Sequence, residues 1–378
     1  MIEKYYSGVI EQIYNRIGKE TRNIVMANYS NDFSIENLEV IRRYQSNEDN
    51  VFFAYSEFSY NTLVGAYEPF LDIICNMHRR FIGGSFDDFQ KECGVYYLHR
   101  QVLNSYYETG ECFREETVLL NEVAYEQRRM TMAIADMLKK LSEVKPLMIV
   151  INRFQMASKS SIETIKYLID NPCANIGIVL GVNAIVKGTD STVEVWDRIV
   201  ESLEDRSAIY YIGSAGPLKN NVKTTNDDEL YITMNFEQSI QEASNIMEFL
   251  DFEQARRGCR IIEHKLKFED AWIDEKSLRR FYMVYARTSV LLGEMSKAIE
   301  LTNEYKALIP ENDSEHYLSL YYFMKGTCYM YQGKLEKAGN SAKSAYDYAV
   351  LAEDDTLIFK AELLSVMIKM SGWYNIFF

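Results

Sequence analysis

The residues best placed for chemistry are Ala27 to Ser34, which follow a short apolar run near the start of the chain. A phosphate-binding loop with the pattern G-x-x-x-x-G-K-[ST] occupies this place in nucleotide-binding α/β domains. With Ser34 at the last position of that pattern, the loop length fits and the final hydroxyl is present. Both glycines and the lysine are missing, because Ala27 and Asp32 replace the glycines and Phe33 replaces the lysine.

These replacements remove the groups that hold a triphosphate. Asp32 places a negative charge where the backbone must approach phosphate closely, and Phe33 removes the ammonium that would neutralise it. Together they shift the local charge by about two units against phosphate. Asn28 and Ser30 remain in this stretch as uncharged polar groups.

A second chemical requirement falls at the end of the apolar run Leu147–Ile151. In enzymes that hydrolyse nucleotides, an acid at this point holds Mg²⁺ and positions water. Asn152 cannot supply that charge, and Arg153 reverses it. We therefore predict a pseudo-ATPase without catalytic residues or a metal site. Its degenerate nucleotide site comprises Asn28, Ser30, Asp32, Phe33, Ser34, Asn152 and Arg153, with no cofactor expected and any ATP or ADP bound only weakly.

Five apolar runs, separated by helical patterns, would position these residues. The runs cover 24–27, 51–55, 147–151, 176–180 and 208–212, and helical periodicity follows Ser34 and fills most of 63–144, 160–169 and 193–203. Continuous apolar strands that alternate with helices predict a parallel sheet covered on both faces. In such a sheet ligands bind at the carboxyl ends of the strands, which is where both polar stretches begin.

The segment Pro146–Ile162 resembles the second nucleotide motif of the STAND-type regulatory ATPases. It keeps the apolar strand, Phe154, Gln155, Ala157, Ser161 and Ile162, and departs from the motif at Asn152 and Arg153 for two acids, Met156 for Trp and Ser158 for Asp. Val51–Ile74 is similar to the second strand and following helix of that family. The resemblance covers roughly the first 215 residues in order and spacing, and it implies a P-loop NTPase-like fold.

The second half of the chain contains a sequence repeat. The segment Gly293–Ala298 recurs as Gly333–Ala338, a shift of 333 − 293 = 40 residues, and Gly372 follows in the same register. Small residues, Ala286, Gly326 and Ser365, lie seven positions before the three glycines. This pattern predicts helix–turn–helix repeats of the tetratricopeptide kind, with a turn at each glycine. An earlier copy around Ala243 and Ala255 lacks the glycine, and generic helical hairpins are the alternative.

These observations predict an α/β plus all-α chain. We expect a degenerate P-loop NTPase-like domain with a parallel five-stranded sheet over residues 1–215, a connecting loop over 216–234, and a tetratricopeptide-like helical repeat array over 235–378. The apolar residues after Gly372 predict an incomplete last hairpin, so we expect a longer array in the whole protein and self-association of this chain.

Composition narrows the classes of function. A net charge of −14 argues against nucleic-acid binding by this segment. The six cysteines form no C-x-x-C pair, and the four histidines show no metal-ligand spacing. No signal peptide or membrane-length apolar run is visible, so we expect a cytoplasmic location and no membrane partner.

The leading interpretation is a non-catalytic sensory or regulatory module, or a scaffold, whose repeats bind a protein or small-molecule effector. The resemblance suggests a bacterial signalling protein or transcriptional regulator. The alternative is a nucleotide-dependent switch that binds ATP or ADP through an atypical phosphate loop. An α/β scaffold that never bound nucleotide, a weak nucleotide binder and a purely structural adaptor all remain open at this stage.

Overall fold

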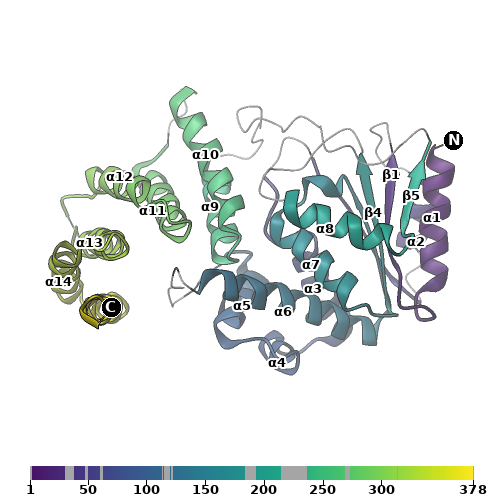
Figure 1. Cartoon of the computed structure of the whole chain (residues 1–378), viewed down its shortest axis with the longest axis horizontal. Helices are drawn as coiled ribbons and strands as arrows, with labels where there is room; N and C mark the ends of the chain where they lie inside the picture. Colours follow the sequence, from purple (N-terminus) through teal and green to yellow (C-terminus); the bar gives the residue numbers. More distant parts are fainter. Residues whose placement is uncertain are drawn as a thin grey trace. The chain divides into compact units, whose positions relative to one another are not determined.

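The chain forms two compact units in the computed structural model. The model describes residues 2–29, 38–46, 50–59, 63–112, 114, 120, 122–183, 193–213, 236–268, 273–312 and 314–377. The first unit comprises residues 1–114, 124–233 and 248–254, and the second comprises residues 115–123, 234–247 and 255–378. Figure 1 labels their helices and strands where there is room.

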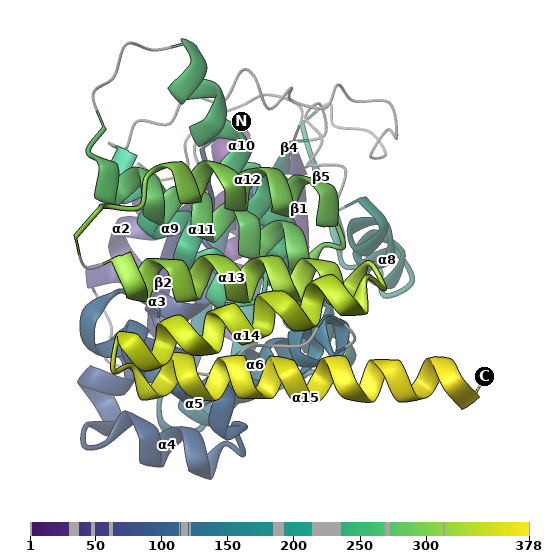
Figure 2. The same cartoon turned by 90° about the vertical axis from the view of Figure 1, so that its left-hand side faces the viewer.

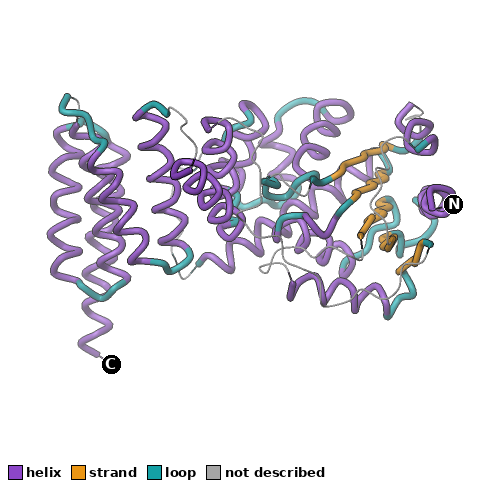
Figure 3. Tube along the Cα trace, turned by 90° about the horizontal axis from the view of Figure 1, so that it is seen from above, coloured by secondary structure: helices purple, strands orange, loops and turns teal. Residues whose placement is uncertain are grey.

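The first unit is built on a five-stranded sheet, whose strands are orange in Figure 3. The paired strands all run parallel, which confirms the predicted sheet. Its order is β2-β3-β4-β1-β5. The strands are β1 Ile24–Tyr29, β2 Phe52–Glu57, β3 Leu147–Asn152, β4 Ile176–Asn183 and β5 Ile209–Ile212. Because β4 lies between β1 and β3, the polar ends of β1 and β3 flank β4 at one edge of the sheet.

Helices cover both faces of this sheet (Figure 1). One face carries α1 and α2, and the other carries α3, α6, α7 and α8, with bounds α1 Ile2–Arg16, α2 Glu39–Ser46, α3 Phe70–Met77, α6 Val123–Val144, α7 Lys159–Asp170 and α8 Val193–Glu204. The sequence patterns did not predict α1. Its buried residues Tyr6, Val9, Ile10 and Ile13 recur at three and four positions, which is the spacing of one helix face against a core.

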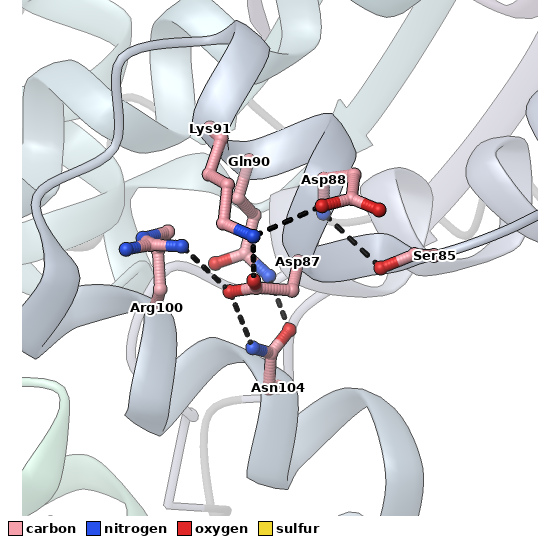
Figure 4. A network of polar contacts seen from close by, with 7 residues as sticks. All are labelled: Ser85, Asp87, Asp88, Gln90, Lys91, Arg100 and Asn104. Atoms are coloured by element: carbon pink, nitrogen blue, oxygen red, sulfur yellow. Dashed lines mark hydrogen bonds and ion pairs between the residues drawn. The ribbon is translucent and has the colours of Figure 1, made fainter.

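A network of polar contacts joins α4 (Phe86–Glu92) to α5 (Tyr97–Thr109), as Figure 4 shows. The Asp87 carboxylate forms ion pairs with Lys91 at 2.7 Å and Arg100 at 2.9 Å, and it accepts a hydrogen bond from Asn104 at 3.1 Å. Its hydrogen bond with Lys91 is the main reason that the pKa of Asp87 lies below its ordinary value. Since these charged groups are matched with one another, we read the network as structural.

The second unit is helical, with α9 Phe236–Glu248, α10 Phe252–Phe268, α11 Glu275–Leu291, α12 Met295–Ala307, α13 Ser314–Tyr331, α14 Leu335–Leu351 and α15 Asp355–Phe377. Gly293 and Gly333 take φ values of 78° and 73° in the turns that follow α11 and α13. In each turn the next N–H donates five residues back, from Glu294 to Ser289 and from Lys334 to Tyr329. This is the glycine-capped helix end that the repeat predicts, so both hairpins are present.

The predicted third turn at Gly372 is wrong, because α15 continues through that residue. Conversely, Leu250 and Glu353 take φ values of 68° and 52° in turns that contain no glycine. A helix tolerates an interior glycine at a cost of about 1 kcal/mol, so glycine spacing alone does not determine the turns. Figure 2 shows α13, α14 and α15 side by side.

Close packing between these three helices depends on Gly326 in α13. A Cβ at this position would lie 3.0 Å from Leu364, 3.3 Å from Ser341 and 3.4 Å from the Ala338 carbonyl. Neighbouring Ala338 and Ala342 are also fully buried. Small residues at the crossing therefore set how closely the helices approach.

We expect Gly326→Leu to lower the free energy of unfolding of the helical unit by about 1–3 kcal/mol, because the side chain overpacks the crossing. The matched control is Gly339→Leu in α14, where an added Cβ meets no atom of the described residues within 4 Å. That variant should keep its stability or gain up to about 1 kcal/mol from helix propensity. Urea denaturation followed by circular dichroism measures both, and equal effects would contradict the packing assignment.

Candidate functional site

The structure brings the described members of the predicted nucleotide site to one edge of the sheet. Asn28 near the end of β1 and Asn152 at the end of β3 are both completely buried. Arg153 follows at φ 53° and begins the turn into the short helix Phe154–Met156. Ser30, Asp32, Phe33 and Ser34 lie outside the described residues.

Asn152 at the end of β3 forms a hydrogen bond within the protein. The Asn152 carboxamide oxygen accepts a hydrogen bond from the hydroxyl of Tyr29, the last residue of β1. Gly181 of β4 lies between them, and an added Cβ there would come 2.9 Å from that same oxygen and closer still to the Tyr6 hydroxyl. Tyr6 from α1 therefore fills the space above Gly181, and no side chain larger than hydrogen fits at this point of β4.

Burial sets the charge state of this cluster. It raises the pKa of Tyr6 well above its ordinary value, and Tyr29, Tyr55 and Glu57 add to the effect. The hydroxyl consequently stays protonated and uncharged at any physiological pH. A neutral, closely packed group of tyrosines and an asparagine occupies the edge where a nucleotide site would need Mg²⁺ and an acid.

Arg153 is also engaged within the protein. Its guanidinium lies 2.9 Å from the Glu57 carboxylate and donates to the Phe58 carbonyl at 3.2 Å. The hydroxyl of Tyr55 donates to the same Glu57. Because Glu57 and Asn152 are partners in the register of β2 and β3, strand pairing itself places the carboxylate beside Arg153.

The side-chain amide of Gln155 forms a hydrogen bond through its oxygen, whereas its nitrogen has no partner among the described residues. Its Oε1 accepts from the Asn183 backbone N–H at the end of β4, at 3.4 Å. Its Nε2 is buried and has no hydrogen-bond partner among the residues that the structure describes. A buried donor of this kind is costly unless it is satisfied, so Gln155 is the residue of this edge best suited to contact a ligand.

Sequence reasoning missed most of the residues that fill this edge. Tyr6 belongs to the unpredicted helix α1, and nothing in the sequence pairs it with Gly181. Glu57 could have been found, because it ends the second strand just as Asn152 ends the third. Among the described residues, no group of three His, Cys, Asp or Glu side chains could hold a metal ion.

A second feature of the first unit is the turn 248–254, which follows α9 and opens α10. Asp251 is buried, and its two carboxylate oxygens accept from the N–H groups of Ser160, in the first turn of α7, and of Gln254. Burial raises the pKa of Asp251, and these two donors oppose the rise. The carboxylate thus bonds to the first turns of two helices, where the helix dipoles favour an anion.

Other buried contacts hold the same turn. Phe249 packs edge-on against Tyr67 and Tyr106, with ring centroids 6.1 and 5.4 Å apart. Gln127 donates to the Leu250 carbonyl at 2.6 Å, and Gln254 donates to the Val64 carbonyl at 3.0 Å. The turn is therefore part of the core of the α/β unit, beside the start of α7, where the degenerate motif ends.

A cavity of about 210 Å³ lies at the opposite, amino-terminal ends of β1 and β5. Its lining includes Arg16, Arg22 and Arg206. Arg16 pairs with Glu20 at 3.6 Å, and Arg206 donates to the Ile169 carbonyl at 2.7 Å. Since ligands of parallel α/β sheets bind at the carboxyl ends of strands, this cavity is not the predicted nucleotide site.

Comparison with known proteins adds no family to this description. No protein-family model matches the chain, and no curated protein matches it. Among the described helices, none has both the length and the apolar composition needed to cross a membrane.

Replacing Asn152 by Asp tests whether this edge can accept an anion. We expect Asn152→Asp to lower the free energy of unfolding by about 1–3 kcal/mol at pH 8, because a carboxylate would be buried there. Its folded-state pKa would lie above the roughly 3.9 of the unfolded chain. The folded state then binds the proton more tightly, so the loss shrinks as pH falls toward 5.

Urea denaturation at pH 5 and pH 8 measures this difference. The control is Asn303→Asp, the same change on the exposed side of α12, which should shift stability by less than about 0.5 kcal/mol at either pH. If Asn152→Asp is as stable as the parent protein at pH 8, the edge is open to solvent and the filled-site description is wrong.

Replacing Asp251 by Asn tests the double helix cap. An amide has one acceptor oxygen, and its NH₂ group would face the second backbone N–H. We therefore expect Asp251→Asn to lower the free energy of unfolding by about 1–3 kcal/mol. The control is Asp274→Asn, because Asp274 caps only α11, through Ser277 at 2.9 Å. Asn caps a single helix as well as Asp does, so the free energy of unfolding of the control should change by less than about 0.5 kcal/mol. Equal losses in chemical denaturation would show that Asp251 is an ordinary cap.

Proposed function

We propose that this chain is a non-catalytic sensory or regulatory module, or a scaffold, of a bacterial signalling protein or transcriptional regulator. In this proposal the first unit is a degenerate P-loop NTPase-like domain that acts as scaffold or switch. The tetratricopeptide-like hairpins of the second unit bind a protein or small effector. The resemblance of residues 146–162 to the STAND motif carries the family part of the proposal.

The observation that supports it best is the filled edge of the sheet. Asn152 stands where a metal-binding acid is required and is bonded to Tyr29, and Arg153 is paired with Glu57. Neither residue offers a charge that could hold Mg²⁺. A domain that retains the sheet without these groups is suited to binding and conformational roles and unsuited to hydrolysis.

The location of the turn 248–254 favours a regulatory module over a purely structural adaptor. Asp251 accepts a hydrogen bond from Ser160 in the first turn of α7, and this turn is the last part of the degenerate motif Pro146–Ile162. Any rearrangement of the motif that moves the start of α7 must therefore break or move this contact. The flanking residues of α9 and α10 belong to the helical unit, so the chain leads directly from this hydrogen-bonded turn into the helices of that unit.

The alternative function, a nucleotide-dependent switch, has one observation in its favour. The buried Nε2 of Gln155, for which the described part of the chain supplies no hydrogen-bond partner, lies at the carboxyl end of the sheet and could donate to a ligand oxygen. Such binding would not need Mg²⁺, because the one acid that the described residues place beside Asn152 is Glu57, which is paired with Arg153.

We expect the purified chain to release no phosphate from ATP or GTP above background, and calorimetry to find at most weak nucleotide binding with little Mg²⁺ dependence. Phosphate release that disappears in an Asn152→Ala, Ser34→Ala double variant would overturn the pseudo-ATPase assignment. Micromolar affinity that requires Mg²⁺ would do the same. Mg²⁺-independent binding that is lost in Gln155→Leu would instead favour the switch.

A further inference from the structure

Helix α15 exposes a continuous apolar stripe. Phe359, Leu363, Val366 and Met370 are 60%, 40%, 50% and 58% exposed. They follow one another at four, three and four positions, so they lie along one face of the helix. At 1.5 Å per residue the stripe is about 16 Å long, which is about three helical turns.

The stripe is separate from the face that holds α15 in the helical unit. Leu357, Ala361, Leu364 and Ile368 are buried, and Leu364 reaches Gly326 of α13. A helix that is apolar on both faces is normally covered on both faces. Four large apolar side chains in one row therefore mark an interaction surface, since scattered exposed residues would not align in this way.

The spacing of the stripe is that of a two-stranded coiled coil. With Leu363 and Met370 at a positions, Phe359 and Val366 fall at d positions. Glu362 and Lys369 are then both at g, on the same flank. Both are exposed, and neither has an ion-pair partner among the described residues.

The charges of Glu362 and Lys369 favour a second copy of α15 as the partner that covers the stripe. When two copies of α15 pair in opposite directions, a and d layers alternate and the g flanks face each other. Phe359 of one copy then meets Met370 of the other, and Leu363 meets Val366. Glu362 lies near Lys369 of the second copy, and the same contact recurs by symmetry, so two opposite-charge pairs border one apolar seam. In a parallel pairing Glu362 would instead lie beside Met367, and this complementarity would be lost.

We propose that α15 is a homodimerisation helix that pairs antiparallel with α15 of a second copy through Phe359, Leu363, Val366 and Met370. The inference does not depend on the nucleotide question, because the stripe and the degenerate site belong to different compact units. The interface is isologous, as a twofold pair requires.

Sedimentation of the whole chain over about 1–100 µM tests the proposal, with a monomer–dimer equilibrium as the expected result. Leu363→Glu should raise the dimer dissociation constant by about 100-fold or more, because a charge would be buried in the seam. The control is Leu351→Glu, which changes another exposed leucine, 68% accessible at the end of α14, and should leave the equilibrium unchanged. Since both side chains are exposed, the helical circular dichroism of each variant should match that of the parent.

Charge exchange tests the direction of pairing. Glu362→Lys should weaken the dimer about fivefold by creating two like-charge contacts, and adding Lys369→Glu should restore the parent value. A chain that stays monomeric at 100 µM, or a dimer that survives Leu363→Glu, would overturn the proposal. A double exchange that fails to restore affinity would overturn the antiparallel arrangement.

Discussion

The hydrogen bond between Tyr29 and Asn152 is the contact on which the account of the first unit depends. It joins the ends of β1 and β3 across Gly181 of β4, in a space that Tyr6 closes from α1. A buried bond of this kind adds only about 1 kcal/mol, but leaving either partner unpaired costs about 1–3 kcal/mol. The edge is therefore stable when neutral and closed, and opening it to an anion would require several side chains to move together.

The turn 248–254 is a second buried feature of the first unit. Asp251 bonds to the start of α7, and the aromatic contacts of Phe249 lie on the same turn. The turn between α9 and α10 is therefore part of the core of the α/β unit.

Much of the fold could be predicted from the sequence, because apolar strands, helical periodicity and the repeated glycine turns are local signals. The loss of charge at Asn152 and Arg153 was also visible. The partners of these residues were not, since Tyr6, Tyr29, Gly181 and Glu57 meet only through the order of the strands and the packing of α1. The prediction of a third turn at Gly372 was wrong, because a single glycine does not end a strongly apolar helix.

The most direct test of the central claim is the thermal stability of the chain in about 5 mM MgATP. A site with a dissociation constant near 50 µM would then stabilise the folded state by about 2.7 kcal/mol, which shifts the midpoint by several degrees. The closed edge predicts a change of less than about 1 °C, the same as with MgCl₂ alone. A shift of several degrees that requires both ATP and Mg²⁺ would contradict it.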